Sequence, residues 1–193
     1  AKAEATLRSK VSTGKPFGLR TFFHGKPSSG KIKDPIKIYG SQKISWIERD
    51  VIKTNIDLID KWKVLMTAVQ GTSAAIETKF LSRPIIAKPG TACTETYLVA
   101  GYFDDEISAK RYATYLRTRF VRFLVSLRKA TQHATRDVYA FVPDIPLDRD
   151  WTDAALYQRY GLTRDEIAFV EAQVAPHEKE LFDPSEDEID VDD

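Results

Sequence analysis

The pattern of apolar and polar positions along the chain predicts several short strands. Apolar residues cluster at 36–39 and 44–48, and Gly40 and Ser41 between them favour a turn, so we expect a β-hairpin there. Residues 63–70 are also expected to form a strand. Residues 83–103 contain two more strand segments on either side of a Lys-Pro-Gly break. All of these segments are short, which predicts a mixed sheet of short strands.

The longest element that the sequence predicts is a helix over residues 105–129. Apolar side chains repeat there at intervals of three and four residues from Tyr112 to Leu127. Residues 104–106 are all acidic, and acidic groups favour the positive end of a helix dipole. We therefore expect one continuous helix that packs on the sheet.

Four shorter elements complete the predicted fold. A short helix is expected at residues 54–62, and a short strand that ends in prolines at residues 138–147. Two helices are expected at residues 151–160 and 162–174, and the second begins with a Thr-x-x-Glu capping box. The predicted fold class is α+β: a mixed sheet of short strands with one long helix packed on it and two C-terminal helices.

Charge divides the chain unevenly, although its formal net charge is only +1. Residues 183–193 carry seven acidic and no basic side chains, which leaves 29 basic against 21 acidic side chains in the rest, a net charge of +8. We expect three regions: a basic arm of loops over residues 1–35, an α/β domain over residues 36–176, and an acidic disordered tail over residues 177–193.

The composition excludes several classes of protein. Cys93 is the only cysteine, so the chain forms no internal disulfide. It also contains no apolar run of about 18 residues of the kind that spans a membrane. We expect a soluble, cytoplasmic protein without a membrane partner. The chain starts with Ala1 and its only methionine is Met66, so we also expect a fragment of a larger protein.

Basic side chains line both edges of the apolar face of the predicted long helix. At about 100° per residue they form two lines, one of Arg111, Arg122 and Lys129 and one of Lys110, Arg117 and Arg128. No acidic residue occurs from Ser108 to Arg136, so we expect these bases to find no partner on their own helix. Two interpretations stay open: contacts to DNA phosphates, or surface side chains of a core helix.

Three other patterns suggest catalysis, and a simpler interpretation fits each. Residues 25–32 have the spacing of a phosphate-binding loop, but Ile32 replaces the magnesium-binding hydroxyl and Pro35 prevents a following helix. Cys93 is interpreted as a small buried thiol, because the three histidines lie in separate segments. The aspartates at 144, 148, 150 and 153 suit turns and helix caps near prolines. We therefore predict no metal site and no catalytic residue.

Five stretches of sequence carry a family resemblance. KPGTACTETYLVAGYFD, YLRTRFVRFLVSLRKATQHATRDVYAFVPDIP and WTDAALYQRYGLTRDEIAFVE resemble the C-terminal portion of bacterial type II restriction-modification methyltransferases, the adenine-specific kind often fused to an endonuclease. VSTGKPFGL and KIYGSQKISWIERDVI are similar to the start of that portion. The resemblance covers residues 11–174, and residues 89–143 are its most specific part.

The resemblance implies that the chain is a target-recognition domain, which grips duplex DNA and reads its sequence. An upstream methyltransferase domain of the parent chain would then methylate adenine with S-adenosylmethionine. The family's Asn-Pro-Pro-aromatic signature and the glycine-rich loop for the methyl donor are both missing here. The resemblance therefore implies no cofactor and no catalysis in this chain by itself.

From charge placement we expect DNA contacts in the N-terminal arm, on the long helix and just after it. The predicted contacts are Lys15, Arg20, His24, Lys26, Lys31, Arg111, Arg122, Arg128, Lys129, Thr131, Gln132, His133 and Arg136. Two alternatives stay open. One is a protein-interaction module that docks an acidic partner or subunit, and the other is a stand-alone nuclease built on the aspartates.

Overall fold

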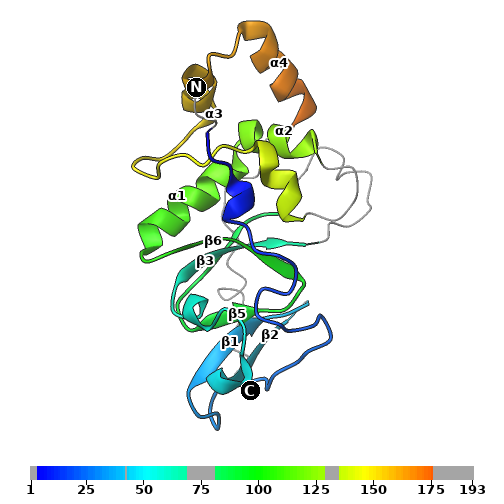
Figure 1. Ribbon diagram of the computed structural model, residues 1–193, viewed down its shortest axis with the longest axis vertical. Helices are drawn as coiled ribbons and strands as arrows, with labels where there is room; N and C mark the ends of the chain where they lie inside the picture. The colour runs from blue at the N-terminus through cyan, green and yellow to red at the C-terminus, as the bar shows by residue number, and fades with distance from the viewer. Residues whose placement is uncertain (1–3, 42, 69–80, 129–134, 176–193) are drawn as a thin grey trace, which may run out of the picture.

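The computed structural model describes residues 4–41, 43–68, 81–128 and 135–175, and these form three layers. Helices lie at one end of an elongated molecule, a three-stranded sheet lies in the middle, and a second three-stranded sheet lies at the other end (Figure 1). The predicted α+β class is confirmed, although the strands form two sheets where one was expected. In these ranges no helix is both long enough and apolar enough to cross a membrane.

The sheet at the far end from the helices contains the predicted hairpin. Strands β1 (Pro35–Tyr39) and β2 (Ile44–Glu48) pair antiparallel, and β5 (Thr91–Cys93) pairs parallel with β1. Because side chains alternate along a strand, Ile36 and Ile38 are buried while Lys37 between them faces outward. The hairpin prediction is confirmed.

The middle sheet supports both hydrophobic cores of the protein. Strand β3 (Trp62–Thr67) lies between β4 (Ile85–Ala87) and β6 (Tyr97–Phe103) and is antiparallel to both. Val64 and Met66 belong to the core beneath the helices, whereas Leu65 belongs to the core shared with the hairpin sheet. Burial of both faces explains why apolar residues occupy three consecutive positions of this strand, Val64, Leu65 and Met66.

The predicted single helix over residues 105–129 is wrong, because the chain forms two helices there. Helix α1 (Glu106–Arg117) ends at Thr118, and helix α2 (Arg119–Ser126) begins after it. Thr118 has extended backbone angles, its hydroxyl donates to the Tyr115 carbonyl at 2.8 Å, and it accepts from the Val121 amide at 3.2 Å. This N-cap starts a second helix without interrupting the apolar pattern that predicted one.

The two predicted C-terminal helices are confirmed. Helix α3 (Asp153–Tyr160) ends at Gly161 in the left-handed conformation, and helix α4 (Arg164–Gln173) begins with the predicted capping box. In that box Thr163 accepts from the Glu166 amide, and the Thr163 amide donates to the Glu166 carboxylate at 2.8 Å.

Two local predictions are corrected. The first part of the strand expected at residues 138–147, residues 138–141, belongs instead to a 3₁₀ helix, η5 (Arg136–Phe141), whose Val138 and Tyr139 are buried in the helical core. The helix expected at residues 54–62 is only one 3₁₀ turn, η3 (Ile56–Leu58), because Asn55 before it has a left-handed backbone with φ of 53°. Two further 3₁₀ turns are η1 (Leu7–Ser9) and η2 (Arg49–Val51).

The described part of the predicted N-terminal arm is integrated into the fold. Leu7 and Val11 are buried in the helical core, and Phe17 and Leu19 are buried in the hairpin core. The Leu7 amide donates to the Val142 carbonyl at 2.9 Å. The boundary expected at residue 35 therefore corresponds to no separation in the structure, and the predicted acidic tail at 177–193 lies outside the described residues.

Candidate nucleic-acid interface

Arg122, one of the predicted DNA contacts, lies inside the helical layer. Its side chain is only 1% exposed. Its Nε donates to the Arg117 carbonyl at 3.1 Å, and its Nη2 donates to the Ala175 carbonyl at 2.7 Å. Burial lowers the pKa of Arg122 to about 10. The helical wheel placed Arg122 on an exposed edge, but helices α3 and α4 pack on α2 from that side, so this residue does not face a surface ligand.

Most other bases of the two helices have partners from other elements or from their own first turn. Lys110 pairs with Glu106 at 2.7 Å, against the expectation that helix bases lack a partner on their own helix. Arg111 Nη1 donates to the Leu147 carbonyl at 2.9 Å, and its Nε lies 3.6 Å from Asp150. Acids and carbonyls of the protein thus balance much of the charge that suggested a DNA-binding helix. Arg119 likewise lies 3.2 Å from Glu171. The partner of Arg128 is an aromatic ring, because its guanidinium carbon lies 5.1 Å from the centre of the Phe141 ring.

The remaining predicted contacts divide into three groups. Lys129, Thr131, Gln132 and His133 lie outside the described residues. Arg136 is exposed at the start of η5, on the helical side of the molecule. The contacts predicted in the N-terminal segment lie with the hairpin sheet: Lys15 is half-buried, and Arg20, His24, Lys26 and Lys31 are exposed.

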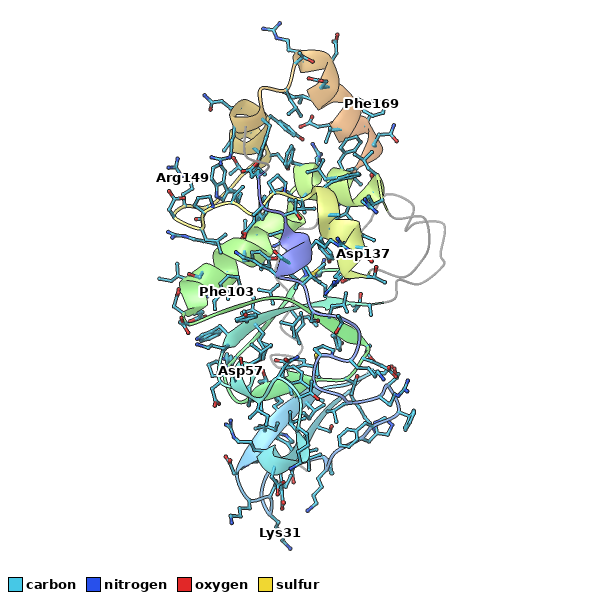
Figure 2. All side chains as sticks on the ribbon, viewed as in Figure 1. Lys31, Asp57, Phe103, Asp137, Arg149 and Phe169 are labelled. Carbon is cyan, nitrogen blue, oxygen red and sulfur yellow. The ribbon has the colours of Figure 1, made fainter. Side chains whose placement is uncertain are left out.

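Unpaired lysines concentrate at the end of the molecule formed by residues 20–53, which we call the hairpin end. These residues contain eight Lys and Arg side chains against three acidic ones. Arg49 and Asp34 pair with each other, and Arg20 lies 3.6 Å from Glu95. Figure 2 shows Lys31 at the extremity of this end. None of the six lysines there forms an ion pair with any other described residue: Lys26, Lys31, Lys33, Lys37, Lys43 and Lys53.

An aromatic side chain lies between a lysine of the preceding loop and a lysine of strand β1. Lys26 forms an antiparallel bridge with Trp46, and Trp46 is paired in turn with Lys37 of β1. Residues directly opposite on neighbouring strands project from the same face, so the tryptophan lies between two lysines. The Lys37 Nζ lies 5.6 Å from the centre of the Trp46 ring. Cations interleaved with aromatic rings are typical of surfaces that bind nucleic acid.

The loop before the hairpin is held at both of its ends. The Thr21 amide donates to the Glu95 carboxylate at 3.1 Å, and the Gly25 amide donates to the Ser45 hydroxyl at 3.1 Å. Gly25 lies so close to β2 that an added Cβ atom would be 2.3 Å from the Trp46 carbonyl oxygen. These contacts fix where the loop presents its exposed side chains.

The sequence signal found the loop lysines and missed the strand residues beside them. Lys33 and Lys43 next to the strands and Lys37 and Trp46 within them were not predicted as contacts. The pattern that predicted the hairpin implied the outward face of Lys37 and Trp46. Alternation places Lys37 and Trp46 opposite the buried isoleucines of the same two strands. The alternation of side chains along the two strands was therefore sufficient to predict Lys37 and Trp46 on the outward face.

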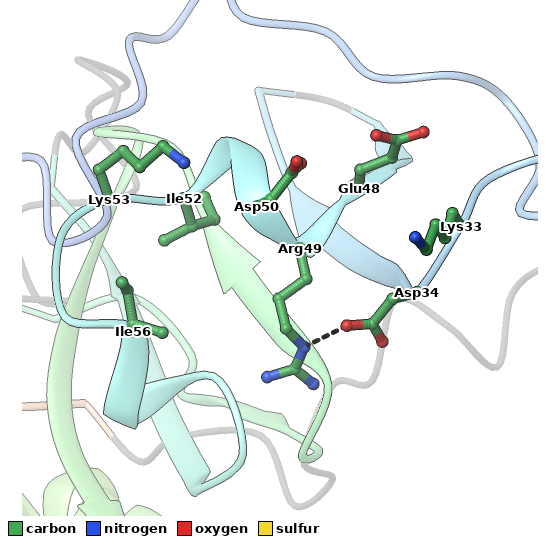
Figure 3. A pocket seen from close by; sticks show the side chains of 8 residues that line it. All are labelled: Lys33, Asp34, Glu48, Arg49, Asp50, Ile52, Lys53 and Ile56. Atoms are coloured by element: carbon green, nitrogen blue, oxygen red, sulfur yellow. Dashed lines mark ion pairs between the residues drawn. The ribbon is translucent and has the colours of Figure 1, made fainter.

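Beside the hairpin lies an open pocket of about 390 Å³ lined by charges of both signs (Figure 3). Arg49 accounts for much of its polarity: two of its nitrogens lie 2.8 Å from the Asp60 oxygens, and its Nε lies 3.0 Å from Asp34. Arg49 lowers the pKa of Asp60. Arg49 is fully engaged by carboxylates, whereas Lys33 and Lys53 in the same lining form no ion pair with any other described residue, so the pocket borders the unpaired basic surface.

Two groups that could serve as a nucleophile or a base, Cys93 and Lys63, are buried. Cys93 is completely buried, as predicted, and burial raises the pKa of its thiol to about 12. Lys63 is also inaccessible, and burial lowers its pKa to about 7. Its Nζ donates to the carbonyls of Leu58, Ile59 and Lys61 at 2.9, 3.0 and 2.6 Å. Both groups are out of reach of a substrate, so neither suggests catalysis.

The aspartates weighed as a nuclease site are used in the fold. Asp153 accepts from the Phe120 amide at 2.9 Å at the start of α2, and Asp144 accepts from Lys10 at 2.7 Å. Within the described ranges, no group of three His, Cys, Asp or Glu side chains is arranged to hold a metal ion. Residues 25–32 lead into strand β1 instead of a helix, so they do not fit a nucleotide or a methyl donor in the way a phosphate-binding loop does.

An apolar groove lies at the other end of the molecule, between α2 and α4. Its volume is about 480 Å³, and its rim carries Asp165 and Glu166. Phe169 is 57% exposed at its edge and packs against Phe123 with ring centres 5.9 Å apart. Figure 2 shows Phe169 among the helices, far from Lys31.

Comparison with known proteins does not extend this description. No family model, curated protein or solved structure matches the chain. The restriction-modification methyltransferase family therefore stays a prediction from the sequence, and the site rests on its own geometry.

Proposed function

We propose that this chain is the DNA-recognition portion of an adenine-specific methyltransferase and that its hairpin end binds duplex DNA. The observation that carries DNA binding is the group of lysines without ion pairs at that end, interleaved with Trp46. The sequence resemblance over residues 89–143 supplies the methyltransferase assignment. In this proposal the upstream domain of the parent chain binds S-adenosylmethionine and acts on the adenine, and this chain holds the DNA.

The proposed contact is mainly electrostatic. Each lysine that approaches a phosphate releases a condensed counterion, so binding weakens steeply as salt rises. Lysine contacts to phosphates fix the position of the protein on DNA but carry little sequence information. Sequence reading would come from the exposed loop that carries Arg20 and His24.

The first test is duplex binding by the whole chain as salt concentration is raised. We expect the triple variant Lys26→Gln, Lys31→Gln, Lys43→Gln to bind more weakly than wild type. Its slope of log affinity against log salt should fall by about 0.9 for each phosphate that the variant no longer neutralises. Fluorescence anisotropy with labelled random-sequence duplexes measures both quantities.

A matched variant at the helical end controls for total charge. Lys110→Gln, Arg149→Gln, Arg164→Gln removes the same three charges from exposed positions on the helical side. We expect it to keep the wild-type salt slope. An equal weakening of binding in the two variants, or no binding by wild type at low salt, would contradict DNA binding by the hairpin end.

The apolar groove between α2 and α4 favours a second candidate function, a protein-interaction module. An apolar groove beside an exposed Phe169 suits an amphipathic helix. The acids on its rim favour a partner with basic flanks, the opposite sign from the acidic partner considered from the sequence. Loss of partner-subunit binding in Phe169→Ala, with DNA binding unchanged, would support this candidate.

A further inference from the structure

Phe22 is the most exposed large apolar side chain among the described residues, at 78%. It occupies the tip of a turn in which the Phe23 amide donates to the Arg20 carbonyl at 2.9 Å. Its neighbour Phe23 is half-buried and packs against the hairpin core. Of two adjacent phenylalanines, one therefore anchors the turn and the other projects from it.

A side-chain carboxylate holds the turn at its start, and backbone hydrogen bonds hold the chain just after it. At the start of the turn, Glu95 accepts from the Thr21 amide and lies 3.6 Å from Arg20. After it, Lys26 exchanges two backbone hydrogen bonds of 2.8 Å with Trp46. Such a turn places the projecting ring at low entropic cost on binding, because little order is left to be gained.

Basic residues lie on both sides of Phe22 in the sequence. Arg20 precedes it by two residues and Lys26 follows it by four, and both are exposed. An apolar ring bordered by cations matches a ligand that is anionic outside and apolar inside. A nucleic-acid duplex has this character, since phosphates border stacked bases, whereas a protein partner for an apolar ring offers an apolar pocket without a phosphate border.

We propose that Phe22 enters the base stack of bound DNA as a wedge, while the lysines of the hairpin end hold the flanking phosphates. This inference rests on the proposed DNA binding and adds a specific contact to it. An inserted apolar side chain partly unstacks one base step, which has an energetic cost that is smallest where the step is already weakened by a mismatch. The wedge therefore predicts a preference for mismatched duplex.

The test compares binding of wild type and Phe22→Ala to a perfect duplex and to the same duplex with one mismatch. We expect wild type to bind the mismatched duplex about tenfold more tightly, and Phe22→Ala to bind both with equal affinity. 2-Aminopurine placed at the mismatch should brighten on binding of wild type, because its fluorescence rises when it is unstacked, and should stay dark with Phe22→Ala. Phe22→Trp, which keeps a large ring, should retain both effects.

Phe169→Ala is the matched control, since it removes an exposed phenylalanine from the opposite end and should behave as wild type. Unchanged thermal midpoints for both alanine variants establish that folding is intact. If wild type binds DNA but Phe22→Ala shows the same mismatch preference and fluorescence, the wedge is overturned and DNA binding stands. If Phe22→Ala loses only a protein partner, the ring serves a protein contact and the wedge is likewise overturned. If wild type binds neither duplex, the proposed function itself fails.

Discussion

Lys63 is a buried lysine whose side chain joins two backbone segments through hydrogen bonds. Its three ammonium protons meet three backbone carbonyls around the turn η3. These bonds offset part of the cost of removing a charge from water. The side chain thus ties the start of β3 to the segment that precedes it.

Stability should depend on pH through Lys63. Its pKa is about 7 when folded and near the ordinary 10.5 when unfolded, so the unfolded chain binds more protons between these values. Stability therefore rises with pH in this window, and we expect a gain of about 2 kcal/mol from pH 7 to pH 9 from this residue. Urea unfolding across this range should show the rise in wild type, and Lys63→Met should remove that part of it. An identical pH slope in both proteins would contradict the role of Lys63.

Gly25 is required by proximity to a neighbouring strand. A Cβ atom there would lie 2.3 Å from the Trp46 carbonyl oxygen and 2.8 Å from an Ile47 methyl carbon, so the loop would have to move away from β2. We expect Gly25→Ala to lower the free energy of unfolding by about 1 to 3 kcal/mol and to weaken DNA binding as well. Gly30→Ala is the control, because an added Cβ atom at Gly30 meets no atom within 4 Å. Chemical denaturation of both variants measures the difference, and equal stabilities would show that the loop can shift freely.

At the scale of the element, the joint at Thr118 decides how the helices lie. Its hydroxyl donates a hydrogen bond to a carbonyl at the end of α1 and accepts one from an amide at the start of α2. We expect Thr118→Ala to cost about 1 to 2 kcal/mol of stability, whereas Thr114→Ala within α1 should cost less because alanine is the better helix former. Thermal unfolding followed by circular dichroism compares them. If the two variants melt together, the cap at Thr118 contributes little.

The same joint shows what the sequence could and could not predict. Amphipathic periodicity found the helical segment, and alternation found the hairpin, because each pattern follows from local geometry. Thr118 did not stand out, since the apolar period continues across it. Likewise, Arg122 lay on an exposed edge of the wheel, and only the packing of α3 and α4 reveals that it is buried. Partners from distant segments decide which bases remain available, and spacing along one helix does not contain that information.

At the scale of the whole molecule, the two cores should unfold together. Trp46 lies in the hairpin sheet and Trp151 is buried in the helical core, so each reports on one end. Because β3 contributes side chains to both cores, we expect their denaturation midpoints to coincide. Variants that keep one of these tryptophans and replace the other two with phenylalanine make each signal separately measurable by fluorescence. Separate midpoints would mean that the ends are independent folding units.

The central strand also has a consequence for how a ligand acts at a distance. A molecule that binds only the folded protein stabilises whatever unfolds with its site. If the chain unfolds as a single unit, DNA bound near Lys31 should slow amide hydrogen exchange in α3 and α4, which it does not touch. DNA binding at the hairpin end would then protect the helical end from local unfolding without changing its conformation, because the two ends unfold together.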